Sequence, residues 1–482
     1  MKLKQLIKGL EVGAVKGSKE VEITGISSDS RTVAPGNLFI AKKGTVSDGT
    51  QFIHQAVSAG AAAIVSDIYD PFLKQTQIIH PRANQITAQL ASRYYGDPSK
   101  ELFVVGITGT KGKTTTSYLV KHLLDGLGMP SGLIGTVETV VGENRFFSTL
   151  TTHDVIANQK LLKEMLLNGC KAASLEVSSH GLVQGRVDEV DFDVGIFTNL
   201  YPDHLDYHST MEEYAAAKKI LFGKVKKLAI LNADSESYDF MEKGCVSPRL
   251  SYGIQRKTDL NASEITFTSG RTDFKVEYQG KSCRFTTPLI GRYNVYNLLG
   301  VIGVGLHLGA ELGQINEILS QFKTVPGRLQ SIPNSRGIQV FVDYAHNGEA
   351  LDNVLKALKE IAPKRLLAVF GCGGNRDPGR RTSMAKSAEK WADISIVTSD
   401  NPRQEDPHEI IRQILSGFKD AKKACVEADR KKAIELAVSM AEKGDIVIIA
   451  GKGHERMQIF AHQTIPFDDV EVAQQALSGA ES

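Results

Sequence analysis

Residues 102–128 read LFVVGITGTKGKTTTSYLVKHLLDGLG. This segment begins with an apolar run typical of a buried strand, passes through a loop of Gly, Thr and Lys, and continues with amphipathic helical periodicity. The positions expected on the inner face of that helix are Leu119, Val120, Leu123, Leu124 and Leu127. A strand, loop and helix in this order predict a parallel sheet covered by helices.

The loop GTKGKTT predicts a phosphate-binding site. Small residues let backbone N–H groups close around phosphate oxygens, and the helix N-terminus adds positive potential. Lys113 would place its charge at the β- and γ-phosphates, and the Thr114 hydroxyl could ligate Mg²⁺. The strict P-loop pattern has a glycine where Ile107 stands, so a simple glycine turn with an exposed lysine is the alternative. The candidate ATP-binding residues of the loop are Gly109, Thr110, Lys111, Gly112, Lys113, Thr114 and Thr115.

Similar units recur on both sides of this segment. AASLEVSS, VGIFTNL and LAILNAD follow it, and IQVFVDYAH, LLAVFGCGG, ISIVTSDNP and DIVIIAGKG come later. Polar GDPSKE at 96–101 and Pro326-Gly327 indicate boundaries. A chain of 482 residues suggests about three domains. We therefore expect an α/β protein with domains 1–100, 101–330 and 331–482, the second built on a P-loop-type, mostly parallel sheet and the third Rossmann-like.

Composition narrows the class of protein. Hydrophobic residues at 41% and charged residues at 23% exclude a disordered chain, and a net charge of +2 favours neither nucleic acid nor a membrane as partner. The longest apolar stretch, 298–310, is too short and too often broken by glycine to span a bilayer. The five cysteines are scattered and predict neither disulfides nor zinc: Cys170, Cys245, Cys283, Cys372 and Cys425. We expect a cytoplasmic protein.

A phosphate loop alone does not name a reaction, so a regulatory P-loop NTPase is one hypothesis. The guanine-reading NKxD pattern is missing, which counts against a GTPase. Glu176 ends a predicted strand, where its side chain would reach the phosphates. His204 and His208 are four residues apart, but the glutamate of a HExxH zinc helix is absent. Glu176 and His204 could instead hold magnesium, although histidine is an unusual ligand for so hard an ion.

The order of ten motifs along the chain distinguishes between these hypotheses. They are GTKGKTTT, LEVSSHGLVQGR, TNLYPDHLDYH, AAAKKILF, GRYNVYN, VPGRLQ, VDYAH, FGCGGNRD, SDNPR and AGKGHE. The chain resembles the Mur ligases in this order over nearly its whole length. It is most similar to the members that add the third amino acid of the peptidoglycan stem peptide.

The resemblance implies an ATP-dependent amide ligase of cytoplasmic peptidoglycan precursor synthesis. Such a ligase converts the D-Glu carboxylate of UDP-N-acetylmuramoyl-L-Ala-D-Glu into an acyl phosphate, which the amine of meso-diaminopimelate attacks. It implies ATP, Mg²⁺ and a CO₂-derived carbamate on Lys218 as cofactors, and we expect a monomer. A lysine-adding sibling and a folylpolyglutamate synthase-like ligase remain as alternatives.

The resemblance also assigns site residues. The implied catalytic set is Lys113, Glu176, His204, Lys218, Arg328 and Asp343, with Asn294 and Asn297 joining Arg328 and Asp343 at ATP. The implied metal set is Thr114, Glu176, His204 and Lys218 as its carbamate. Carbamylation requires a deprotonated lysine, hence one that is buried or near other cations. Without the resemblance, Lys218-Lys219 would be read as a solvated pair.

The two remaining substrates receive residues in the same way. For the UDP-sugar dipeptide these are Ser30, Thr151, Thr152, Ser178, Gln184 and Arg186, with departures from the family pattern at Thr45-Val46-Ser47 and Leu150. For diaminopimelate they are Arg376, Asp400, Asn401, Pro402, Arg403, Gly451 and Glu455. Arg403 in DNPR would grip the carboxylate that lysine lacks. A dinucleotide reading of FGCGGNRD fails because Arg376 replaces the third glycine.

Overall fold

The structure is a computed structural model that describes residues 1–42, 48–268, 270–362 and 364–479. The chain forms two compact units. The first comprises Met1–Leu260 and Leu299–Glu311, and the second comprises Asn261–Leu298 and Leu312–Ser482. The division into three domains at 100 and 330 stays a prediction.

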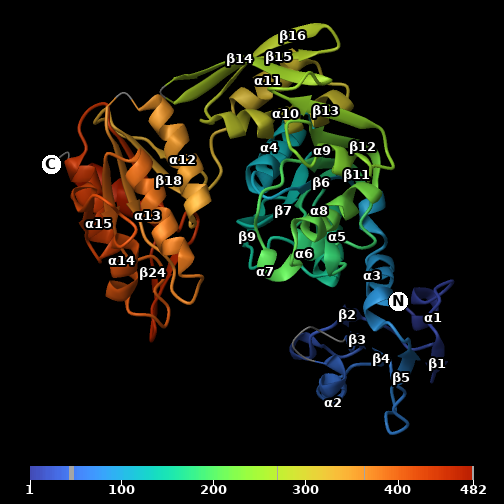
Figure 1. Cartoon of the computed structure of the whole chain (residues 1–482). Helices are drawn as coiled ribbons and strands as arrows, with labels where there is room; N and C mark the ends of the chain where they lie inside the picture. Colours follow the sequence, from blue (N-terminus) through green and yellow to red (C-terminus); the bar gives the residue numbers. More distant parts are fainter. Residues whose placement is uncertain (43–47, 269, 363, 480–482) are drawn as a thin grey trace. The chain divides into compact units, whose positions relative to one another are not determined.

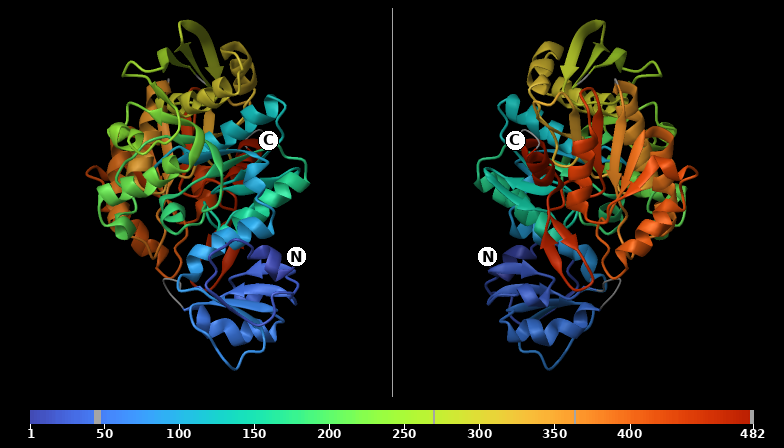
Figure 2. Two further views of the ribbon diagram at one scale, coloured as in Figure 1. Left: turned by 90° about the vertical axis from the view of Figure 1, so that its right-hand side faces the viewer. Right: turned by 90° about the vertical axis from the view of Figure 1, so that its left-hand side faces the viewer.

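The first hundred residues of the first unit form a five-stranded sheet in the order β1-β5-β4-β3-β2. Its strands are β1 (Ala14–Lys16), β2 (Gly25–Ser27), β3 (Asn37–Ile40), β4 (Ala63–Ser66) and β5 (Thr76–Ile79). Its helices are α1 (Leu3–Leu6), α2 (Ile53–Ser58) and α3 (Ala83–Tyr94). Leu38 and Ile40 pack toward α3, whereas Phe39 packs toward α2, so that the sheet lies between two helices (Figure 2).

The rest of the first unit is built on strands in the order β13-β12-β11-β6-β10-β7-β8-β9. The strands are β6 (Phe103–Thr108), β7 (Ser131–Ile134), β8 (Glu138–Val141), β9 (Asn144–Phe147), β10 (Ala172–Glu176), β11 (Phe192–Phe197), β12 (Val225–Asn232) and β13 (Arg249–Gly253). The helices are α4 (Lys113–Gly126), α5 (Val155–Leu167), α6 (Ser179–Val183), α7 (Leu205–His208), α8 (Met211–Lys219) and α9 (Tyr238–Glu242). From β13 to β7 all neighbouring strands are parallel, and β8 and β9 pair antiparallel.

The strand–loop–helix segment folds as its sequence predicts. β6 lies between β11 and β10 in the sheet, and α4 begins directly after Gly112, whose φ of 88° permits the turn into the helix. Four of the five expected inner-face residues of α4 are fully buried: Leu119, Val120, Leu123 and Leu124. Leu127 is the exception, because the helix ends at Gly126 and Leu127 is its half-buried C-cap.

The second unit starts with three strands, β14 (Leu260–Thr268), β15 (Arg271–Tyr278) and β16 (Lys281–Thr287). β15 and β16 pair antiparallel, and α11 (Leu312–Ser320) packs on β16. α10 (Arg292–His307) runs from one unit into the other along the chain.

A six-stranded sheet of order β17-β18-β22-β19-β20-β21 forms the rest of the second unit. Its strands are β17 (Gln330–Ile332), β18 (Gln339–Asp343), β19 (Leu366–Phe370), β20 (Ile394–Val397), β21 (Ala424–Val426) and β22 (Ile446–Ala450), with a separate hairpin β23 (Met457–Ile459) and β24 (Thr464–Pro466). Its helices are α12 (Gly348–Ile361), α13 (Gly379–Trp391), α14 (Pro407–Leu415), α15 (Arg430–Met440) and α16 (Asp469–Gly479) (Figure 1).

Alternate residues of these strands belong to different cores. Ala368 packs with α12 and α13, whereas Leu367 and Val369 pack with α15 and α16. All pairs except β17–β18 are parallel. A parallel sheet covered by helices on both faces is the Rossmann-like arrangement that was expected. The predicted α/β fold class is therefore confirmed.

Among the described residues, no helix is both long and apolar enough to cross a membrane.

Candidate functional site

Two lysine side chains converge on the phosphate loop of the first unit. The Lys113 Nζ donates to the carbonyl oxygens of Gly109 and Thr110 at 2.8 and 3.0 Å. The Lys218 Nζ, carried by α8, donates to the same Gly109 oxygen at 2.9 Å. Gly109 has a φ of 151°, and a Cβ there would collide with Thr198 Oγ1. The loop therefore concentrates positive charge at a helix N-terminus, as binding of phosphate requires.

Two residues that the sequence analysis did not single out hold this loop. The Asn199 side chain accepts from Lys111 N at 2.9 Å and donates to Lys111 O at 3.1 Å. Thr198 Oγ1 donates to Lys111 O at 2.7 Å. Both residues directly follow β11, the neighbour of β6, so their place after a buried strand was the available indication.

The Glu176 carboxylate lies at the end of β10 with only 1% of the residue exposed. Its Oε2 is 3.0 Å from Thr114 Oγ1 and 2.9 Å from Thr136 Oγ1, and its Oε1 accepts from Thr136 N at 2.9 Å. Gly135 follows the adjacent β7, and a Cβ at that position would collide with Glu176 Oε1. Glu176 and Thr114 were expected together from the sequence, whereas no sequence pattern pointed to Thr136 or Gly135.

Lys218 is 1% exposed and lies beside an aromatic ring. Its Nζ is 4.3 Å from the centroid of Tyr214, whose hydroxyl is 3.2 Å from Thr110 Oγ1. Burial, and secondly the charge of Lys113, hold the pKa of Lys218 well below its ordinary value. Lys219 is only partly buried and lies over Phe240 instead. Lys218 thus has the environment that carbamylation requires.

His204 lies at the start of α7 with a left-handed backbone, φ 56°. Burial lowers its pKa, opposed by the charge of Asp203, which forms a 3.1 Å ion pair with Lys111. The ring of His180 lies 5.0 Å from that of His204. A neutral imidazole is favoured here, and His180 is a neighbour that spacing alone did not indicate.

The oxygen donors around Glu176 suit a hard cation. One carboxylate with two hydroxyls is the ligand type that Mg²⁺ prefers, whereas the His204 imidazole is not. Among the described residues there is no group of three or more His, Cys, Asp or Glu side chains that could hold a metal ion. Unmodified Lys218 is a cation donor and cannot supply a second anion. Thr114 and Glu176 therefore fit magnesium, and the expected carbamate would add the missing charge.

Four residues expected at the UDP-sugar dipeptide lie together beside the carboxyl end of β10. The Thr152 hydroxyl contacts Glu176 O and Ser178 Oγ at 2.9 and 3.1 Å. Arg186 donates to Thr152 O at 2.8 Å and to Gln184 Oε1 at 2.7 Å. Thr151 Oγ1 is 3.1 Å from Thr136 Oγ1, which ties it to the Glu176 group.

Ser30 belongs to the N-terminal sheet region, where its hydroxyl donates to Gln55 at 2.8 Å. Leu150 is exposed, and Thr45-Val46-Ser47 lies outside the described residues.

The residues expected at the nucleotide within the second unit surround the end of β18. Asp343 is 7% exposed and accepts from Leu329 N and Ala345 N at 2.7 and 2.8 Å. Burial raises its pKa, opposed by Arg328. The Arg328 Cζ lies 4.9 Å from the Tyr344 ring centroid, and its buried Nε has no hydrogen-bond partner among the described residues. Such an atom is available to a ligand acceptor.

Asn294 and Asn297, both buried in the first turns of α10, form a separate pair in which Asn297 Nδ2 donates to Asn294 Oδ1 at 3.0 Å.

Three loops meet at the carboxyl edge of the six-stranded sheet. FGCGG follows β19, SDNPR follows β20 and GKGHE follows β22. Gly374 N donates to Asn401 O at 2.9 Å, and a Cβ on Gly374 would collide with Pro402 O. Asn401 Nδ2 donates to Glu455 Oε2 at 2.8 Å, and a Cβ on Gly451 would lie 2.5 Å from Asp400 Oδ2. The glycines thus permit close approach of these loops.

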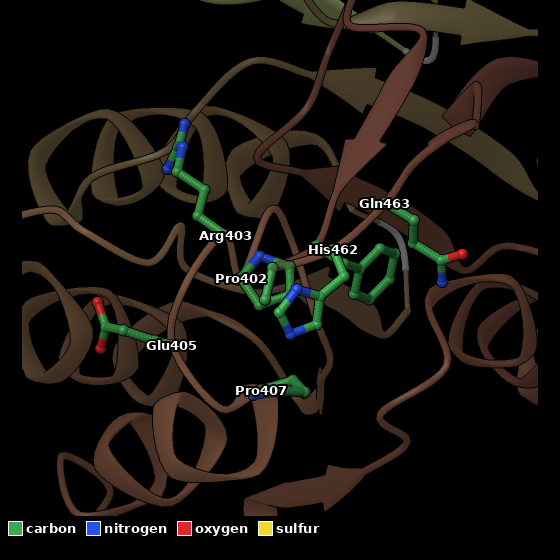
Figure 3. A pocket seen from close by; sticks show the side chains of 8 residues that line it. Pro402, Arg403, Glu405, Pro407, His462 and Gln463 are labelled. Carbon is green, nitrogen blue, oxygen red and sulfur yellow. The ribbon is translucent and has the colours of Figure 1, made fainter.

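Arg403 has a left-handed backbone, φ 52°, and its N donates to Ile459 O at 3.0 Å. Its side chain extends away from Pro402 and His462 (Figure 3), and Nη1 donates to Gly374 O at 2.7 Å. A pocket of about 280 Å³ lies beside this loop, lined by Pro402, Arg403, Glu405, Pro407, Phe460, Ala461, His462 and Gln463. Arg376, also on the FGCGGNRD loop, is exposed. The structure brings the seven residues expected at diaminopimelate to one sheet edge.

Three family descriptions match the chain. The Mur ligase family, catalytic domain, matches residues 22–95, the Mur ligase middle domain residues 107–305, and the Mur ligase, glutamate ligase domain, residues 327–453. The chain is 45% identical to a UDP-N-acetylmuramoyl-L-alanyl-D-glutamate--2,6-diaminopimelate ligase of Chlamydia caviae over 99% of each chain. It is 44% identical to that of Chlamydia felis, also over 99% of each. A solved structure of a ligase with the same name is 32% identical, with a TM-score of 0.75 and coverage of 100% and 99%.

Proposed function

The chain belongs to the Mur ligase family, and from this we propose that it is the ligase that adds 2,6-diaminopimelate to UDP-N-acetylmuramoyl-L-Ala-D-Glu. It is an ATP-dependent enzyme of peptidoglycan precursor synthesis, and so serves cell-wall biogenesis, cell shape and division. The finer points, meso-diaminopimelate as the stereoisomer, the cytoplasm as its location and a monomer as its state, are part of this proposal.

The reaction has two steps, and the first unit carries the groups for the first. The γ-phosphoryl group of ATP passes to the D-Glu carboxylate, giving an acyl phosphate and ADP. Lys113 and the loop N–H groups bind the phosphates, and they stabilise transferred negative charge by position rather than by covalent chemistry. Thr114, Glu176 and the Lys218 carbamate would hold Mg²⁺, which neutralises phosphate charge when it is bound. Thr152, Ser178, Gln184 and Arg186 would bind the dipeptide end.

The second unit carries the groups for the second step. The amine of diaminopimelate attacks the acyl carbonyl, and inorganic phosphate leaves from the tetrahedral intermediate. Arg376 and Arg403 would each pair with one carboxylate of the amino acid, and Gly451 and Glu455 would hold its distal ammonium group. Arg328, Asp343, Asn294 and Asn297 would position the nucleotide.

One observation carries the choice of amino acid. The DNPR turn and the GKGHE loop come from different strands, yet Asn401 Nδ2 donates directly to Glu455 Oε2 at 2.8 Å. The Arg403 guanidinium donates to Gly374 O in the neighbouring loop, so a guanidinium, an amide and a carboxylate lie at one sheet edge. Such a set of side chains can recognise an amino acid whose far end carries both an ammonium and a carboxylate.

The test is a phosphate-release assay with UDP-N-acetylmuramoyl-L-Ala-D-Glu held constant. We expect release with meso-diaminopimelate, far less with lysine, and none when either the amino acid or the dipeptide substrate is omitted. Equal release without the dipeptide would identify a plain NTPase. Release with glutamate and a folate in its place would identify a folylpolyglutamate synthase-like ligase.

A further inference from the structure

Lys452 is a buried cation for which the proposed reaction has no role so far. It lies in GKGHE between Gly451 and Glu455, and it is 0% exposed. Burial of an ammonium group is costly unless the group is paired and hydrogen-bonded. Its Nζ contacts Asn401 Oδ1 at 3.1 Å, Glu455 Oε2 at 3.2 Å and Met457 O at 2.6 Å. Three acceptors match the three N–H bonds of an ammonium group.

These contacts fix the Asn401 side chain completely. Its Oδ1 accepts from Lys452 and from Ile459 N at 3.0 Å, while its Nδ2 donates to Glu455 Oε2. Because Oδ1 faces only donors and Nδ2 faces a carboxylate, one orientation of the amide is strongly favoured. Lys452 and the Ile459 N–H together therefore set which way the Asn401 amide points.

Glu455 is held through one of its two oxygens. Both contacts, from Lys452 and from Asn401, reach Oε2, and no described residue bonds Oε1. The Glu455 side chain is 34% exposed, so Oε1 has access to solvent and to a ligand. A carboxylate held in this way loses little conformational freedom when a ligand ammonium binds.

We propose that Lys452 is a positioning residue for the amino-acid substrate: its buried ammonium holds the Asn401 amide and Oε2 of Glu455, and so presents Oε1 of Glu455 to the distal ammonium group of the amino acid. The inference rests on the proposed function, because it takes Glu455 to bind that group. Lys452 acts through its two neighbours and does not touch the substrate itself.

The chain offers a matched control at the opposite edge of the same sheet. Arg365 precedes β19 and pairs with Asp445, which precedes β22 and is 0% exposed; Arg365 Nη2 lies 2.5 Å from Asp445 Oδ2. Like Lys452, Arg365 satisfies a carboxylate between two strands, but at the amino ends of these strands. Loss of either cation should lower the melting temperature, and only loss of Lys452 should affect the amino-acid site.

The experiment compares wild type with Lys452→Met, Glu455→Gln, the double variant and Arg365→Met. For each protein, kcat and KM are measured for meso-diaminopimelate, ATP and the UDP-dipeptide, together with the melting temperature. Lys452→Met should raise KM for diaminopimelate about 10- to 100-fold, by analogy with the loss when groups that support metal ligands are removed, with the KM values for ATP and the UDP-dipeptide unchanged. The double variant should lose no more than the worse single variant, because both substitutions disable one unit.

Each outcome of this experiment either supports or overturns the positioning role of Lys452. An unchanged KM for diaminopimelate, an equal rise in all three KM values, or additive losses in the double variant would overturn the positioning role. If Lys452→Met melts below the assay temperature, Lys452→Gln, which keeps a donor, takes its place. Failure of both to fold would make Lys452 a residue of the fold alone and overturn the inference. Absence of diaminopimelate-dependent phosphate release in wild type is a separate result, which contradicts the proposed function itself.

Discussion

Lys113 and Lys218 donate to one carbonyl oxygen, that of Gly109, at 2.8 and 2.9 Å. Two ammonium groups at one acceptor repel each other, and this repulsion adds to burial in lowering the pKa of Lys218. The pair can be stabilised by an incoming phosphate or by conversion of one lysine to an anion. We therefore predict that activity requires a positive charge on Lys113 and a negative charge, that of the carbamate, on Lys218.

Lys113→Ala should lower kcat by at least about 10²- to 10³-fold, because it removes a positive group from the transferred phosphoryl charge. The melting temperature should stay close to that of wild type, since Lys113 serves no packing role. Lys121→Ala is the control on the same helix, since the Lys121 Nζ forms an exposed-side ion pair with Asp125 and no other ion pair within the described part of the chain. Phosphate release measures the outcome, and a fully active, folded Lys113→Ala protein would remove the phosphate assignment.

Lys218→Ala should also be inactive, but through loss of an anion. Small carboxylic acids such as formate or acetate should then restore part of the activity, because they can occupy the place of the carbamate. Neither acid should restore Lys113→Ala. Lys219→Ala, which loses the contact with Phe240 and none with the phosphate loop among the described residues, should be active. Intact-mass measurement in bicarbonate gives an independent check, and full activity of Lys218→Ala would show that no carbamate is needed.

Gly135→Ala should weaken magnesium use without removing a single ligand. The added Cβ collides with Glu176 Oε1 and would push the carboxylate from its place beside Thr114. We expect the Mg²⁺ concentration for half-maximal activity to rise about 10- to 100-fold. Gly223→Ala is the matched control, because a Cβ there meets no atom within 4 Å. Equal Mg²⁺ titrations for both variants would argue against Glu176 as a metal ligand.

Arg403→Ala should cost about 2–5 kcal/mol with meso-diaminopimelate, or roughly 30- to 5000-fold in kcat/KM, because the distal carboxylate would be left unpaired. Lysine, which lacks that carboxylate, should lose much less. Arg412→Ala removes only an exposed pair with Glu409 on α14 and serves as the control. The measurement is kcat/KM for both amino acids, and equal losses for both would assign Arg403 to the fold.

His454 should make stability depend on pH between about 6.5 and 4. Burial, and secondly the charge of Arg328, lower its pKa to about 4, whereas an unfolded histidine titrates near ~6.5. The unfolded state binds the proton more tightly, so stability is fully present above pH ~6.5 and falls as the pH drops toward 4. The difference reaches at most about 3 kcal/mol. Melting curves at pH 5 and 7.5 test this for wild type, His454→Gln and the exposed control His408→Gln. Between the two pH values, the melting temperature of His454→Gln should change less than that of wild type. The melting temperature of His408→Gln should change as much as that of wild type.

Local sequence was sufficient to predict the fold class, and it suggested site residues whose roles stay predictions. The segment 102–128 predicted β6, the phosphate loop and α4, because apolar periodicity and loop glycines express backbone preferences that do not depend on distant residues. The helix end was misjudged at Leu127 for the same reason: the apolar pattern continues one residue beyond Gly126, where the helix stops. Ten ordered motifs were enough to indicate the Mur ligases.

Tertiary structure alone decided which side chains meet. β6 lies between β11 and β10, which come later in the chain, and this order brings Thr198 and Glu176 to either side of the phosphate loop. In the second unit the parallel order β18-β22-β19-β20 gathers three loops at one edge, where Lys452 joins Asn401 to Glu455. Such pairings arise from packing between strands distant in sequence, so no single motif encodes them. The sequence by itself therefore determined the chemistry of each loop, and strand order determined the groups in which these loops act.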